Sequence, residues 1–162
     1  MKLSGKVAQN GLHAFDAEPR THGGIEILRF WIVVADNEKA HIYRKASKGL
    51  ERIAEARAGH SRAGHEETGP SNATQHGHDA RSREKHHHDS VFIQKLAALL
   101  DQAAQENVFD RLVLIAPPHA LGDIRAFLNK DVHRRIAAEV SKDLVNMPDK
   151  EVEEHLAKIV WF

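Results

Sequence analysis

The chain contains no cysteine, and this absence excludes disulfide frameworks, thiolate zinc sites and cysteine nucleophiles. An excess of one charge is also missing, since 23 lysine and arginine residues balance 23 aspartate and glutamate residues. The whole chain therefore has no electrostatic preference for nucleic acid or for an anionic membrane. No apolar run approaches the roughly 20 residues that a membrane helix needs, and the N-terminus, MKLSGKVAQNGLHAF, lacks a signal-peptide core. We therefore expect a cytoplasmic protein without a membrane span.

The length and composition predict one domain with an extension. A chain of 162 residues with 41% hydrophobic residues is long enough for a single core. Residues 1–28 keep neither a helical nor a strand period, so we expect a flexible N-terminal extension with a short local element around 25–28. The folded domain then covers residues 29–162.

Three strands are predicted at the start of this domain. Phe30–Ala35 (FWIVVA) is uninterrupted and apolar, which is typical of a central strand buried on both faces. Residues 40–46 alternate after a short turn and fit a hairpin partner. Residues 50–56 form a weaker strand whose glutamate and arginine side chains suit the edge of a sheet.

Residues 57–89 lack large apolar side chains and contain seven of the 13 histidines of the chain. A segment that buries so little surface does not offset its ordering entropy, so we expect a long, mobile, histidine-rich loop. With ordinary histidine pKa values near 6.5, this loop would become positively charged below about pH 6.

Alternating helices and strands are predicted for the rest of the chain. Residues 90–106 form an amphipathic helix that Asp89 or Ser90 would cap. Arg111–Ala116 is a buried strand that runs into a helix over 118–128, with Pro118 at the first helical position. Residues 136–144 favour helix by propensity but alternate as a strand, and Pro148 opens a last helix.

With a strand at 136–144, the order is βββ-α-β-α-β-α. This order predicts an α/β domain with one mixed sheet and helices packed on it. It is the element order of ribonuclease-H-like folds. Order alone indicates a fold and no activity.

Three blocks of sequence carry a family resemblance. They are WIVVAD at 31–36 followed by KAHIY, LVLIAPPHALGDIRAFL at 112–128, and SKDLVNMPDKEVEEHL at 141–156. In this order they resemble the bacterial host attachment protein family, over about residues 30–160. That family is similar to the middle domain of the class-1 peptide release factor of eukaryotes and archaea. The resemblance implies that fold and a non-enzymatic, ribosome- or RNA-associated binding factor with an indirect role in attachment.

The resemblance also indicates where a hydrolase would carry its chemistry. In the release factor a Gly-Gly-Gln tripeptide precedes the long helix, and here that place holds Gln75-His76-Gly77. Gln75 is thus a candidate for peptidyl-tRNA hydrolysis, although the tripeptide itself is missing. A metal-dependent nuclease would instead use Asp36. Because Asp36 ends its strand and enters a turn, we interpret it as a turn former.

Histidines offer candidate metal ligands in the 57–89 segment. They are His76, His78, His86, His87 and His88. Histidine-rich tracts bind transition metals, but a mobile loop lacks the fixed geometry of a defined site. We therefore expect adventitious metal binding and no cofactor.

Binding candidates lie at the strand-to-helix junction near residue 118 and in the last family-like block. His119, Asp123 and Arg125 follow the strand-to-helix junction, and ligands often bind at such carboxyl ends in open α/β sheets. Lys142 and Asp143 are a further pair within the family-like block, and we interpret them as part of an ion pair that pins the sheet to a neighbouring loop.

A third hypothesis is a structural or regulatory module that binds a protein partner through the sheet edge at 50–56. The sequence predicts no oligomeric state.

Overall fold

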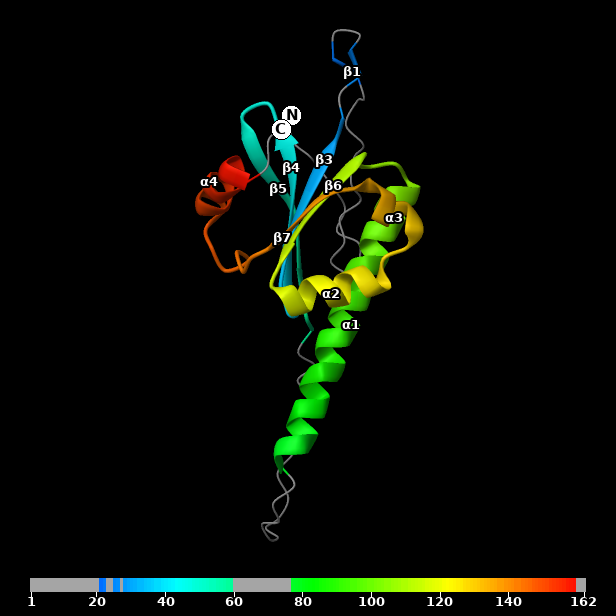
Figure 1. The fold of residues 1–162 in the computed structure, drawn as a ribbon, viewed down its shortest axis with the longest axis vertical. Helices are drawn as coiled ribbons and strands as arrows, with labels where there is room; N and C mark the ends of the chain where they lie inside the picture. Colours follow the sequence, from blue (N-terminus) through cyan, green and yellow to red (C-terminus); the bar gives the residue numbers. More distant parts are fainter. Residues whose placement is uncertain (1–20, 23–24, 27, 60–76, 160–162) are drawn as a thin grey trace.

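A computed structural model describes residues 21–22, 25–26, 28–59 and 77–159. Five strands form one sheet in the order β5-β4-β3-β6-β7 (Figure 1). Their bounds are β3 Phe30–Ala35, β4 Lys39–Ala46, β5 Gly49–Arg57, β6 Arg111–Ala116 and β7 Ile136–Ser141. Two further strands, β1 Thr21–His22 and β2 Ile25–Glu26, pair only with each other.

The sheet is mixed because its two halves are connected differently. β3, β4 and β5 form an antiparallel meander, whereas β6 lies parallel to β3 and β7 lies parallel to β6. β3 is the central strand, and its residues from Trp31 to Ala35 are all buried. Its apolar side chains can fill both faces of the sheet, since neighbours in a strand point to opposite faces.

Helices cover both faces of the sheet (Figure 1). α1 (Gly77–Gln105), α2 (Pro118–Phe127) and α3 (Lys130–Arg135) pack on one face, and α4 (Asp149–Ile159) lies on the other. Pro118 opens α2 at a position where its missing N–H costs no hydrogen bond. None of the described helices is long and apolar enough to cross a membrane.

The predicted architecture is confirmed, with two additions. Each predicted segment, at 30–35, 40–46, 50–56, 111–116 and 136–144, overlaps one of the five strands within a few residues at its ends, and β5 lies at an edge of the sheet. The additions are the short β1–β2 pair and α3. The side chain of Asn129 caps α3 by accepting a hydrogen bond from the backbone N–H of Val132 at 2.9 Å.

The start of the long helix corrects the prediction. α1 begins at Gly77 rather than near residue 90, so residues 77–89 are helical and Asp89 and Ser90 lie inside the helix. Residues 78–105 contain neither glycine nor proline, and nothing in them breaks a helix. The first turns of α1 extend beyond the sheet (Figure 1), and no apolar period in the sequence marks them as helix. Residues 60–76 of the predicted loop and 1–20 of the predicted extension lie outside the described residues.

Candidate functional site

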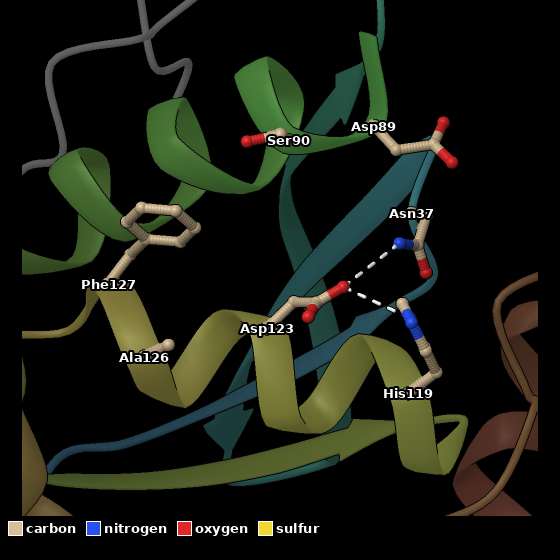
Figure 2. Close-up of a pocket in the computed structure, with 7 residues that line it drawn as sticks. All are labelled: Asn37, Asp89, Ser90, His119, Asp123, Ala126 and Phe127. Atoms are coloured by element: carbon tan, nitrogen blue, oxygen red, sulfur yellow. Dashed lines mark hydrogen bonds and ion pairs between the residues drawn. The ribbon is translucent and has the colours of Figure 1, made fainter. Parts of the chain in front are cut away.

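A cavity of about 310 Å³ lies where the chain leaves the centre of the sheet in two directions. β3 continues to β4 on one side, and β6 continues through α2 and α3 to β7 on the other. Such divergence beside the carboxyl ends of strands is the usual position of ligand sites in α/β sheets. The lining residues are Asn37, Asp89, Ser90, His119, Asp123, Ala126 and Phe127 (Figure 2).

Asp123 is at the centre of the polar contacts in this cavity (Figure 2). Its Oδ2 lies 3.1 Å from His119 Nδ1 and accepts a hydrogen bond from Asn37 Nδ2 at 3.4 Å. His119 and Asp123 stand one turn apart on α2, while Asn37 comes from the turn after β3. The side chain of Asp123 is 41% exposed, so the carboxylate is held in place yet remains accessible.

The rest of the lining is partly acidic and partly aromatic. Asp89 is half-buried on α1, and within the described part of the chain its carboxylate has no hydrogen bond or ion pair. Ser90 accepts a hydrogen bond from Gln94 Nε2 at 3.2 Å on the same helix. Phe127 is 44% exposed, which is unusual for a large hydrophobic residue in this domain.

The structure brings two of the predicted binding residues into the cavity and leaves three outside it. His119 and Asp123 line it, whereas Arg125 forms an ion pair with Glu139 Oε1 on β7 at 3.3 Å. Lys142 and Asp143 are exposed after β7, and within the described part of the chain neither forms the expected ion pair to a neighbouring loop. The backbone N–H of Lys142 instead donates to the carbonyl of Ala116.

The structure describes some of the candidates for hydrolysis and for metal binding. Asp36 Oδ1 accepts the backbone N–H groups of Glu38 and Lys39 at 2.7 and 2.6 Å, so it shapes the turn as expected. Gln75 and His76 lie outside the described residues. His78, His86, His87 and His88 belong to helix α1. Within the described ranges no three histidine or acidic residues are grouped so that they could hold a metal ion.

A second polar cluster lies beside α4, and the sequence did not reveal it. Tyr43 donates to Asp149 Oδ1 at 2.9 Å, and Arg52 Nε lies 3.4 Å from Asp149 Oδ2. His41 is only 7% exposed, with Nε2 3.7 Å from Glu55 Oε2 and Nδ1 without a partner in the described part of the chain. The alternation of 40–46 places His41 and Tyr43 on one side of β4, but nothing in the sequence links them to the start of a helix 106 residues after Tyr43.

The surroundings of His41 and Tyr43 favour the neutral forms of these two side chains. Burial, followed by the positive charge of Arg52, lowers the pKa of His41 from 6.5, and these effects outweigh the carboxylates of Glu55 and Asp149. Burial and the hydrogen bond to Asp149 raise the pKa of Tyr43 well above 10.0. The cluster is therefore a structural network in which two buried groups, His41 and Tyr43, resist ionisation.

Three helices on one face of this mixed sheet and one helix on the other define an α/β domain with helices on both faces. An archaeal translation termination factor, aRF1, is similar to the chain with a TM-score of 0.50 and 14% identity over 82% of the chain and 35% of the factor. An archaeal protein matches with a TM-score of 0.37 and 15% identity over 80% of the chain and 36% of that protein. The chain thus spans about a third of the length of each. No curated protein sequence matches it significantly.

The family model described as "Protein required for attachment to host cells" matches residues 31–156. The chain belongs to this family, and the expected resemblance is confirmed. The similarity to the termination factor, at 14% identity, shows the shared fold.

Proposed function

We propose that the protein is a non-enzymatic binding factor that associates with the ribosome or with RNA and influences attachment to host cells only indirectly. Its family and its termination-factor-like fold support this proposal. The observation that carries it is the geometry of α1. The C-terminal part of this helix packs into the core from Phe92 to Ala104, and the first turns extend beyond the sheet (Figure 1).

The sequence of these first turns suits contact with phosphate groups. Residues 77–88 contain Arg81, Arg83 and Lys85 against only Asp79 and Glu84. Four histidines in the same turns add positive charge below about pH 6. A projecting helix with an excess of basic residues provides an electrostatic contact for RNA that the neutral chain as a whole lacks.

Two alternatives receive less support. The candidate nuclease residue Asp36 uses one carboxylate oxygen for its own turn, and a Gly-Gly-Gln tripeptide is absent from the sequence. Strand β5 is at the sheet edge, but its glutamate and arginine side chains discourage the addition of a partner strand. We therefore favour binding through α1 over hydrolysis or edge pairing.

Ribosome co-sedimentation through a sucrose gradient tests the proposal. We expect the wild-type protein to migrate with ribosomal particles at low salt and to dissociate as salt rises. The triple variant Arg81→Glu, Arg83→Glu, Lys85→Glu should reduce the bound fraction roughly tenfold, because it removes three phosphate-binding charges.

The matched control reverses three exposed lysines elsewhere, Lys48, Lys130 and Lys158, and should change the bound fraction less than about twofold. Circular dichroism should show that both variants remain folded. A protein that stays in the soluble fraction at every salt concentration, or equal losses in both variants, would refute the proposal.

A further inference from the structure

We propose that the cavity between α1 and α2 binds the guanidinium group of an arginine that a protein partner presents. This inference does not depend on the proposed association with RNA. It rests on the charge, the free hydrogen-bond acceptors and the aromatic side chain of the cavity lining.

The charge of the cavity selects a cation. Asp89 and Asp123 contribute two carboxylates, and neither lysine nor arginine is among the lining residues. Asp89 is half-buried and has no partner in the described part of the chain, so its charge is not compensated there. A phosphate would be repelled by both carboxylates, which argues against the RNA backbone as the ligand. A metal ion is also disfavoured, because the described residues contain no group of three suitable ligands.

The acceptors in the cavity suit a donor with several N–H groups. Asp123 uses Oδ2 for the contacts with His119 and Asn37, so its Oδ1 remains available. Figure 2 shows Asp123 projecting from α2 toward Asn37, with Asp89 of α1 on the far side of Asn37. A planar guanidinium has five N–H donors and can bridge separate carboxylates, whereas the ammonium of lysine is a compact point charge.

Phe127 adds a flat apolar surface at the end of α2. It is 44% exposed and lines the cavity together with Ala126. Arginine stacks on aromatic rings better than lysine does. A cavity of about 310 Å³ is at the small end of the range for ligand pockets, which suits one side chain rather than a whole cofactor.

NMR titration tests the inference with N-acetyl-arginine methylamide as the probe. We expect chemical-shift changes at the amides of Asn37, Asp89, Asp123 and Phe127, with a Kd on the order of 1–10 mM for so small a ligand. The citrulline analogue has nearly the same shape without the charge, and it should bind at least about tenfold more weakly. Equal binding of the two analogues, or shifts scattered outside the cavity, would overturn the inference.

Charge-removing variants assign the site. Asp123→Asn and Asp89→Asn should each weaken binding about fivefold. Asp143→Asn is the matched control, because Asp143 is exposed and lies outside the cavity. Equal weakening by Asp143→Asn would show that only the overall charge matters, and the site would be rejected. Phe127→Leu should reduce the preference for the arginine analogue over the lysine analogue.

Two further titrations distinguish an arginine side chain of a protein partner from free arginine and from a nucleotide. Free L-arginine should bind no more tightly than the blocked analogue, since no lining cation is placed to receive an α-carboxylate; tighter binding would indicate a small-molecule site. Guanosine 5′-monophosphate should not shift the cavity amides. If it shifts them and the arginine analogue does not, the cavity is a nucleobase site and the inference is wrong.

Discussion

The two faces of the sheet are built from different kinds of contact. On the face covered by α1, α2 and α3, the core is apolar, and Trp31 stacks on Phe109 with ring centroids 5.0 Å apart. On the face covered by α4, the core is smaller and contains Tyr43. His41 lies next to Tyr43 on that face, and the centroids of the two rings are 6.3 Å apart.

The difference suggests that one face of the sheet supplies most of the folding free energy and the other makes the folding free energy depend on pH. Apolar contacts are insensitive to protonation, so the three-helix face should supply most of the free energy of folding at any moderate pH. The α4 face buries ionisable groups, and their protonation is linked to folding. The four predictions below test this separation, beginning with the largest expected effect.

Replacing Phe109 with alanine should destabilise the protein by about 3–5 kcal/mol. Phe109 is fully buried, stacks on Trp31 and lies under the guanidinium of Arg135, 5.6 Å from the ring centroid. The same change at the exposed Phe127 should cost less than about 1 kcal/mol. Urea denaturation measures both free energies of unfolding, and similar losses in the two variants would contradict the assignment of the core.

The sequence predicted most of the fold because the strands are marked by apolar residues. Short, uninterrupted apolar runs are typical of buried strands, and two of them form Phe30–Ala35 and Arg111–Ala116. The start of α1 was missed, since a polar helix that leaves the core has no apolar period to mark it. α3 was missed because six residues between Asn129 and β7 are too short for a periodic signal.

The candidate site was predicted only in part. The strand-to-helix junction correctly drew attention to His119 and Asp123, because a general rule relates strand ends to ligand sites. Asn37 and Asp89 join them through contacts between segments far apart in the sequence, and no local pattern records such contacts. For the same reason, the partnership of Tyr43 with Asp149 was not predictable.

A second prediction compares leucines on the two faces. Leu156 of α4 is 1% exposed, and Leu156→Ala should cost about 2–3 kcal/mol. Leu100 of α1 is 0% exposed in the larger core, and Leu100→Ala should cost about 4 kcal/mol, since more packed neighbours surround the void. Denaturant titration of both variants gives the comparison. A larger loss at Leu156 would reverse the ranking of the faces.

A third prediction concerns Tyr43, which is the only tyrosine of the chain. Tyr43→Phe should lower the stability near neutral pH by about 1 kcal/mol, because Asp149 loses the hydroxyl donor. The folded-state pKa of Tyr43 is raised above 10.0, so its contribution is complete below that pH and is lost as the pH rises further.

Ultraviolet absorbance in the wild-type protein reports this tyrosine alone. Tyrosinate should appear only well above pH 10.0, and Tyr43→Phe should lose less stability than the wild type in that range. Ionisation of the folded protein at the ordinary pH of a tyrosine would show that the hydroxyl is not engaged.

The smallest effect is expected at His41, on the acidic side. Its pKa is lowered in the folded state by burial and by Arg52, so the unfolded chain binds a proton first as the pH falls below 6.5. Stability is thus complete above pH 6.5 and declines below it. His41→Gln should flatten this part of the stability profile, because it removes the buried imidazole. Urea denaturation at several pH values measures the slope; an equal slope in the wild type and in His41→Gln would place the acid sensitivity elsewhere and remove the distinction between the two faces.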